Sequence, residues 1–331
     1  MRKITIVLAA IVLAVSVARS AEAQTFPSRP VKLAVPFPAG GGTDLLARAV
    51  AEALTKKWGH PVYVENLSGA ASGNVGASEV ARAAPDGYTL SAGDQTAFVV
   101  STIMNSVQYD VMKDFAPISL LSTSPVLLVG RNSLSQGNLR ELIEWLRANP
   151  GKASLATTGQ GGGPHIVGGA FQAKTATQMQ VVPYRGVAAA LQDLMAGHVD
   201  LLFVEIAGAL PYVREGKLRA YAVLAQWRSH AAPDIPTIEE AGGPPLHITT
   251  WRGLWAPRGS PDTVIEKLNA AVTEALGDPH VQERVASVGQ EVVLPLQMNP
   301  QALAMHHRAE LDRWRILIKL ASEVDLRAER R

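Results

Sequence analysis

The sequence predicts an α/β protein of two lobes, each a mostly parallel sheet flanked by helices, with a ligand cleft between the lobes. Short apolar runs that favour strands alternate with segments of helical periodicity along nearly the whole chain. Two of the runs end in bare glycine loops that lead into helices, one in each predicted lobe. The 331 residues, 47% hydrophobic and 18% charged, suffice for about two domains.

Residues 1–23 are predicted to be a secretory signal peptide. Arg2 and Lys3 precede an apolar run at 4–17 that is too short for a good membrane span, and Ala21-x-Ala23 is a cleavage signal. We therefore expect a mature chain that begins near residue 24, in the periplasm. Removing three of the 31 basic and one of the 29 acidic residues leaves 28 of each, which offers no electrostatic footprint for nucleic acid. The chain has no cysteine, so disulfides and thiol chemistry are excluded.

The first strand is predicted at 31–35 and ends at Pro36 and Pro38 in the stretch VKLAVPFPAGGGTD. Three glycines, 40–42, leave the following backbone bare, and Thr43 or Asp44 can cap a helix that runs to Trp58-Gly59. Such a loop directs several N–H groups at one point beside the positive end of a helix dipole. A carboxylate could bind there without any Lys or Arg. The alternative is an ordinary strand-to-helix turn.

Two further loops are predicted beside this one. A strand at 61–65 leads into the glycine-rich turn 66–77 and a helix at 77–84. A strand at 88–92 ends in the polar residues Asp94, Gln95 and Thr96. Because ligands collect outside the carboxyl ends of parallel strands, these three loops are the expected first-lobe wall of the pocket.

The second lobe repeats the pattern, since a strand at 154–157 runs into glycines 159 and 161–163, with His165 at the start of the next helix. The other elements expected are an apolar run at 126–129, helices at 139–146, 188–196 and 210–215, and strands at 180–183, 199–204 and 218–224. A returning strand at 249–256 and helices at 262–276 and 300–320 complete the chain. We expect lobe 1 to comprise residues 24–124 and 248–331, and lobe 2 residues 125–247.

The order PFPAGGGTD, ENLSGAASGNVGA, ARAAPDGYTL resembles the substrate-binding proteins of tripartite tricarboxylate transporters, the Bug (Bordetella uptake gene) family. Similar strings follow in order over almost the whole mature chain: YDVMKDFAPIS, ATTGQGGGPH, VPYRG, GHVDLLF, PYVREGKLRAYAV and TTWRGLWAPRGSP. The resemblance implies a two-lobed, type II-like periplasmic binding protein that closes on a small carboxylate and delivers it to a membrane permease. It also implies that ordered waters help to hold the carboxylate. We expect a monomer without a cofactor.

The mechanism expected is hinge closure, with the carboxylate docked on the first glycine loop and the second lobe closing over it. The residues expected to contact the ligand are Phe37, Ala39, Gly40, Gly41, Gly42, Thr43, Asp44, Gly73, Asn74, Gln95, Thr96, Thr158, Gly159, Gly161, Gly162, His165, Tyr184, Arg185 and Glu205. For some of them a structural role is open: Asp44 as a helix-cap or first-turn residue, His165 as a side chain bonded to backbone, and Arg185 as a surface cation.

Competing chemistries lack their motifs. There is no GxxxxGK[ST] loop, no GxGxxG after the first strand and no GxSxG elbow. His306, His307 and Glu310 have helical spacing, but without a further ligand nearby we expect a solvated face rather than a metal site. Trp251 and Trp255 are expected to pack. No catalytic residue is predicted, although a secreted enzyme with its active site in the cleft, or a ligand-sensing adaptor, stays open as an alternative.

One position departs from the family pattern. Where the family usually has Asp and then commonly Asn, this chain has Val204 and Glu205. Val204 cannot pair with an ammonium group, which favours a pocket for acids that lack one, apolar or aromatic acids included. The alternative is that Val204 packs beneath the following helix, while Glu205 points to the opposite side of the strand.

Overall fold

A computed structural model describes residues 26–68, 73–159 and 161–329, with side chains described to residue 324. The predicted signal peptide lies outside these residues. Within the described residues, no helix is both long enough and apolar enough to span a membrane.

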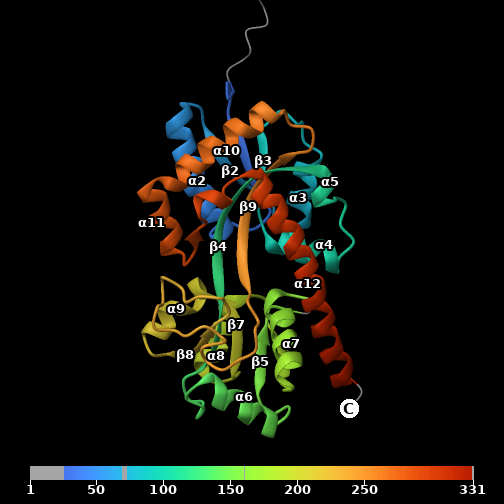
Figure 1. Ribbon diagram of the computed structural model, residues 1–331, viewed down its shortest axis with the longest axis vertical. Coiled ribbons are helices and arrows are strands. Elements are labelled where there is room, and N and C mark those ends of the chain that lie inside the picture. Colours follow the sequence, from blue (N-terminus) through green and yellow to red (C-terminus); the bar gives the residue numbers. More distant parts are fainter. Residues whose placement is uncertain (1–25, 69–72, 160, 330–331) are drawn as a thin grey trace, which may run out of the picture.

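A single sheet runs through the molecule in the order β2-β1-β3-β9-β4-β7-β5-β6 (Figure 1). In its first half, β1 (Val31–Val35) pairs in parallel with β2 (Val62–Asn66) and β3 (Thr89–Asp94). In its second half, β5 (Ser154–Thr157) pairs in parallel with β6 (Gln180–Pro183) and β7 (Leu201–Glu205). The α/β class predicted from the alternating runs is confirmed.

Two long antiparallel strands join the halves. β4 (Phe115–Arg131) pairs with β9 (Thr249–Pro257) up to Pro125 and with β7 from Val126 onward. β8 (Leu218–Val223) pairs with the last residues of β4, 127–131, and β10 (Glu291–Val292) pairs with its middle, at Ser122 and Thr123. β4 is therefore one continuous strand shared by both halves, and both β4 and β9 run lengthwise between them in Figure 1.

Helices cover both halves. Around the first half lie α2 (Gly42–Trp58), α3 (Asn74–Ala81), the π-helix η1 (Thr96–Val100), α4 (Ser101–Met104), α5 (Val111–Asp114), α10 (Asp262–Gly277), α11 (Pro279–Ser287) and the 3₁₀-helix η2 (Pro295–Gln297). Around the second lie α6 (Leu139–Ala148), α7 (Gly163–Thr175), α8 (Val187–Ala196) and α9 (Ile206–Arg214). The last helix, α12 (Pro300–Glu329), begins beside the first half and ends beside α7 of the second (Figure 1).

Several predicted boundaries are wrong by a turn or more. The apolar run 126–129 is the end of the 17-residue β4, and the helix predicted at 77–84 begins at Asn74. α9 begins at Ile206 rather than at 210, and Pro211 lies inside this helix. α12 continues well past 320, and α11, which Asp278 caps through the His280 N–H, was not predicted.

The main hydrophobic core is continuous between the halves. It extends from β1 and α2 to Phe171 of α7 and Phe203 of β7, and Trp314 and Ala321 of α12 belong to it. A second cluster, on the other face of the second half-sheet, contains Leu127 and alternate residues of β7. α12 thus packs against both halves of the sheet, and the division of the chain into two lobes stays a prediction.

Candidate functional site

The first glycine loop joins β1 to α2. Gly41 precedes the helix, and no side chain caps it, so the prediction that Thr43 or Asp44 is the N-cap is wrong. Both residues lie inside the first turn instead. Gly40 adopts a φ of +85°, which favours glycine, and its N–H donates to Asp44 Oδ2 at 2.9 Å. The loop is exposed at Ala39, Gly40 and Gly41, so its backbone is accessible.

Asp44 fixes the shape of this loop. Its carboxylate accepts hydrogen bonds from the Asn66 side chain at 2.8 Å and from Arg48 at 3.0 Å, and Asn66 also donates to the carbonyl of Phe37 at 3.0 Å. Burial alone would raise the pKa of Asp44, but the hydrogen bonds from Arg48, Gly40 and Asn66 outweigh it and hold the pKa below its ordinary value. The structural alternative for Asp44, a first-turn role, is the one that these contacts support.

The loops after β1, β2 and β3 meet, as the strand order predicts. Gly73 has a φ of +77°, and a Cβ there would lie 3.0 Å from Ala97 Cβ, 3.1 Å from the carbonyl of Pro36 and 3.2 Å from Phe37 Cε1. Asn74 points elsewhere, since its Oδ1 accepts from Ser101 Oγ at 2.6 Å.

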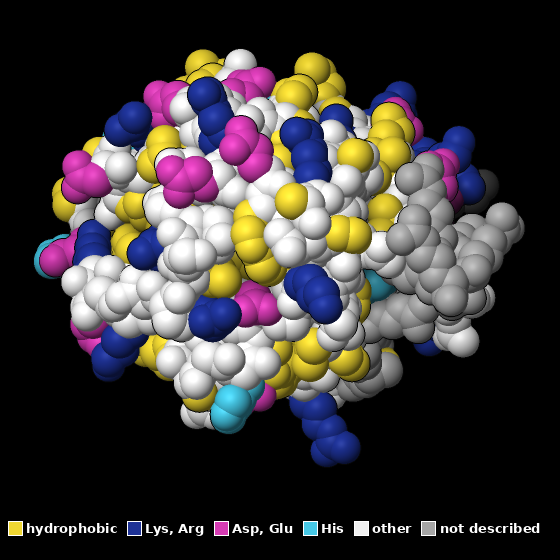
Figure 2. Space-filling model, turned by 90° about the horizontal axis from the view of Figure 1, so that it is seen from below, with side chains coloured by type: hydrophobic (Ala, Val, Ile, Leu, Met, Phe, Trp, Pro, Cys, Tyr) yellow, Lys and Arg dark blue, Asp and Glu magenta, His cyan; other side chains and the backbone are white. Residues whose placement is uncertain are grey.

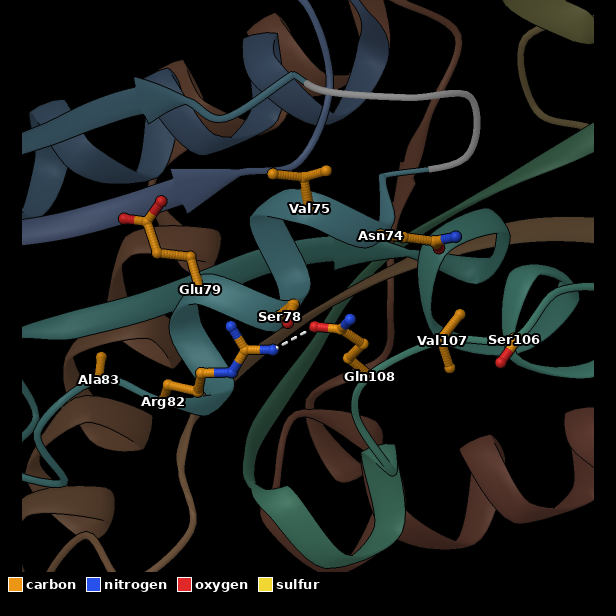
Figure 3. A pocket seen from close by; sticks show the side chains of 9 residues that line it. All are labelled: Asn74, Val75, Ser78, Glu79, Arg82, Ala83, Ser106, Val107 and Gln108. Carbon is orange, nitrogen blue, oxygen red and sulfur yellow. Dashed lines mark hydrogen bonds between the residues drawn. The ribbon is translucent and has the colours of Figure 1, made fainter.

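A separate cavity of about 750 Å³ lies along α3. Figure 3 shows Asn74, Ser78 and Arg82 on one side and the segment 106–108 on the other, with Arg82 donating to Gln108 Oε1 at 2.6 Å. Of the residues expected to contact the ligand, only Asn74 lines this cavity. The other residues expected to contact the ligand therefore lie outside this cavity.

The end of β3 contributes a carboxylate to the first wall. Asp94 Oδ1 accepts from the N–H of Thr96 at 2.8 Å and of Ala97 at 3.2 Å, and Oδ2 accepts from Thr43 Oγ1 at 3.3 Å. Burial raises the pKa of Asp94 to about 6, although Arg252 opposes the shift. Gln95 is buried and Thr96 is exposed beside it.

A buried arginine lies beside the glycine loop. Arg252 of β9 is 3% exposed, and its Nη2 would lie 3.1 Å from a Cβ at Gly42. Gln290 closes the same side, since its Nε2 donates to the Gly42 carbonyl at 2.8 Å and its Oε1 accepts from Ser122 at 2.6 Å. The β3–β9 pairing thus brings an arginine to a loop where the sequence predicted that a carboxylate could bind without any Lys or Arg, and that prediction stays open.

The second glycine loop faces the first half of the molecule. Gly159 and Gly161 have φ values of +98° and +77°, and the Gly161 N–H donates to His165 Nδ1 at 3.3 Å. A Cβ at Gly161 would lie 3.2 Å from Met104 Cε of α4. A Cβ at Gly162 would lie only 2.6 Å from Thr158 Oγ1, so this loop is closely packed on itself.

The loop after β6 has a different environment. Tyr184 donates through its hydroxyl to Asp193 Oδ2 of α8 at 2.7 Å, and burial together with Asp193 raises the pKa of Tyr184 to about 12. Arg185 is exposed and makes no side-chain hydrogen bond or ion pair with any residue that the structure describes. No hydrogen bond or ion pair among the described residues joins Tyr184 or Arg185 to the first glycine loop.

The residues at the end of β7 take opposite sides. Glu205 Oε2 accepts from Arg252 Nη2 at 2.8 Å and so bridges the two halves. Val204 is 4% exposed and packs in the second core cluster with Ile206, Ala209 and Leu210. Val204 thus packs beneath α9, as the alternative interpretation held, and gives no basis for a preference among acids.

The histidines of α12 do not form a solvated face. His307 and Glu310 are 2% and 4% exposed, which contradicts that expectation. His307 Nε2 lies 2.8 Å from the Phe98 carbonyl, and burial lowers the pKa of His307 to about 4. Glu310 accepts from Trp314 and Arg313, and Trp251 packs edge-on against His306. Within the part of the chain that the structure describes, no group of three acidic or histidine side chains could hold a metal.

Comparison with known proteins identifies the family. A model described as the tripartite tricarboxylate transporter family receptor matches residues 46–322. The chain belongs to this family. BugT of Bordetella pertussis is 33% identical over 316 residues, which cover 95% of this chain and 96% of BugT. MatC of Rhodopseudomonas palustris, solved with bound malate, is 36% identical with a TM-score of 0.76 over 88% of this chain and 100% of MatC. A second R. palustris protein, solved with adipate, is 32% identical with a TM-score of 0.78 over 90% of this chain and 98% of that protein.

The Bug-family resemblance and the α/β binding-protein fold are thus confirmed, and the chain is a periplasmic binding protein that serves as a transporter receptor. Sequence reasoning placed the loops after β1, β2 and β3 together and named Asp94 at the end of β3, but it missed two side chains beside Gly42, Arg252 and Gln290. The polar end of the β3 run pointed towards Asp94. The only signal for Arg252 was a charge in the otherwise apolar run 251–257.

Proposed function

We propose that this receptor binds a small carboxylate between the two halves of the molecule and delivers it to the permease subunits of its transporter. The observation that carries the proposal is the exposed glycine loop at the start of α2. The first N–H groups of a helix have no acceptor within it, and the helix dipole favours an anion there. Asp44 holds the loop in shape, so its N–H donors are set before a ligand arrives.

The relatives support the same chemistry, because proteins 36% and 32% identical to this chain were solved with malate and adipate. Closure would bring the loops that follow β5 and β6 towards the ligand about a hinge in β4 and β9. On this proposal lobe 1 comprises residues 24–124 and 248–331 and lobe 2 residues 125–247. A cleaved signal peptide of residues 1–23, a monomeric state and the lack of catalysis belong to the same proposal.

The remaining site residues have defined places in this proposal. Thr158, Gly159, Gly161, Gly162 and His165 form the wall that approaches from the second half. Tyr184 and Arg185 would join them only after a movement of the β6 loop. The face of the second half seen in Figure 2 carries acidic and basic side chains mixed together, which agrees with a receptor for a small molecule rather than a binder of nucleic acid.

The decisive experiment is a Gly41→Val variant. Gly41 has a φ of −75°, and a Cβ there meets only the Pro38 carbonyl at 3.7 Å, so valine fits the fold while covering the exposed backbone. A panel of mono-, di- and aromatic carboxylates is first screened against the wild-type protein by thermal shift, where an acid at about a hundred times its Kd adds about 2.7 kcal/mol to the free energy of unfolding.

Calorimetry with the best acid should then show at least a tenfold loss of affinity in Gly41→Val, about 1.4 kcal/mol. Gly277→Val is the control, since a Cβ there meets nothing within 4 Å. Undiminished affinity in a folded Gly41→Val protein would contradict the glycine-loop site, and conversion of the acid during incubation would favour an enzyme. Gly162→Val is a poorer test because its side chain would disturb Thr158.

A further inference from the structure

We propose that Arg252 is the cationic anchor for the ligand carboxylate, and that Glu205 is an internal competitor that holds the same guanidinium when no ligand is bound. The inference rests on the proposed carboxylate-binding function. It adds the residue that supplies the positive charge and a reason for the ion pair between the two halves.

Arg252 is placed for this role by the register of the sheet. It pairs with Asp94 of β3 on one side and with Ser122 of β4 on the other, so all three side chains leave the same face. Its Nη2 would lie 3.1 Å and its Cζ 3.6 Å from a Cβ at Gly42, the first residue of α2. The guanidinium therefore adds a full charge to a helix N-terminus that already favours an anion.

Only some of the hydrogen-bond donors of the Arg252 guanidinium have acceptors in the described part of the chain. Its Nε and Nη2 atoms form one edge that can donate two parallel hydrogen bonds to a carboxylate. Nη2 donates to Glu205 Oε2 at 2.8 Å, whereas Nε is buried and has no acceptor among the described residues. Nη1 lies 3.4 Å from Thr250 Oγ1. Glu205 thus occupies half of the edge, and a ligand carboxylate beside Gly42 would be able to occupy all of it.

The side chain of Glu205 can readily release Arg252. Its side chain is 36% exposed and starts from the residue before α9, while the Arg252 side chain is 4% exposed. Glu205 can turn to solvent at little cost, but the buried arginine needs an anion in its place. Exchange of one carboxylate for another conserves the charge around Arg252. A molecule in which Glu205 is bound to Arg252 cannot bind the ligand through this arginine. The apparent affinity for the ligand is therefore reduced by the fraction of molecules in which Arg252 is available.

The test compares charge-removing variants on the two sides of the ion pair. Calorimetry with malate, adipate and the carboxylate panel is performed on the wild-type protein, Glu205→Gln, Arg252→Gln and Arg252→Lys. We expect Glu205→Gln to bind the best acid about tenfold more tightly, and Arg252→Gln at least tenfold more weakly. Arg252→Lys keeps the charge but loses the two-donor edge, so we expect intermediate affinity. Glu283→Gln and Arg258→Gln, both exposed, are the matched controls.

If the ion pair had only a structural role, removal of either charge would weaken binding of the acid or leave it unchanged, and Glu205→Gln would not bind the acid more tightly. Unchanged or weaker binding in Glu205→Gln would overturn the competitor role. Wild-type affinity in a folded Arg252→Lys or Arg252→Gln protein would overturn the anchor, and if Arg252→Gln does not fold, Arg252→Lys and Glu205→Gln decide. Failure of the wild-type protein to bind any acid would contradict the proposed function itself, before any variant is compared.

Discussion

Asp44 is the single residue on which the first glycine loop most depends. It is 1% exposed, and its carboxylate accepts from Gly40, Arg48 and Asn66. Hydrogen bonds to a buried charge contribute about 1.5–3 kcal/mol each, and removal of the acceptor leaves the donors unsatisfied.

We predict that Asp44→Ala lowers the free energy of unfolding by about 2–4 kcal/mol at pH 7, measured by urea denaturation. Because the folded protein lowers the pKa of Asp44, its stabilising effect is present at neutral pH and is lost as the pH falls through the folded pKa. Glu266→Ala, at an exposed acid on α10, is the control and should stay within about 0.5 kcal/mol of wild type. Equal stability of both variants would contradict the role assigned to Asp44.

Asp94 shows the opposite behaviour. Its pKa rises from 3.8 to about 6 on folding, so the folded protein binds more protons than the unfolded chain between these pH values. The contribution of this group to stability is therefore highest at low pH and declines as the pH rises from about 4 to above 6. Asparagine can still accept from the N–H groups of Thr96 and Ala97 but does not ionise.

We predict that the free energy of unfolding of Asp94→Asn gains on that of the wild-type protein as the pH rises from 4 to 7, with no further change above pH 7. Urea denaturation across this range measures the difference, and Asp312→Asn, on the exposed face of α12, serves as control. Parallel pH profiles of the Asp94→Asn and wild-type proteins would show that Asp94 does not titrate as described.

Helices α7 and α12 pack closely against each other at Gly169. A Cβ at Gly169 would lie 2.6 Å from Ala321 Cβ and 2.7 Å from Ala321 Cα. Alanine normally favours a helix interior over glycine by roughly 1 kcal/mol. Here we predict the reverse, a loss of about 1–3 kcal/mol in Gly169→Ala, because the added methyl group pushes the two helices apart.

The matched control for this prediction is Gly163→Ala in the same helix, where a Cβ meets nothing within 4 Å. We expect it to be neutral or stabilising by urea denaturation. A Gly169→Ala protein as stable as this control would mean that α12 can move away from α7 without cost.

At the scale of single elements, the short strands could be predicted from the sequence, but the long strand β4 could not. The runs 154–157 and 180–183 have the bounds of β5 and β6, because turn residues flank each run. β4 contains Pro117 and Pro125, which in sequence indicate strand ends. In the structure the pairing with β9 shifts register after Pro117, and the strand changes partners at Pro125. Arg252 was missed for a related reason, because the local sequence pattern does not show that β9 lies between β3 and β4.

At the scale of the whole molecule, both halves need the C-terminal part of the chain to complete their structure. β9 supplies a strand between β3 and β4, and α12 covers α7, so residues beyond 248 serve both halves. We predict that a chain of residues 24–247 shows no cooperative urea transition and is cleaved rapidly by protease, whereas residues 24–331 unfold in one transition. A cooperative transition in the shorter chain would contradict the shared core.

The late position of β9 and α12 also bears on biosynthesis. A chain that crosses a membrane through a narrow channel must remain unfolded until it has passed through. Contacts between distant segments form slowly, and here the strand that completes the first half-sheet and the helix that seals α7 both follow residue 248. Stable folding must therefore wait for the last quarter of the sequence, so the connectivity of the fold itself would keep an exported precursor competent for translocation.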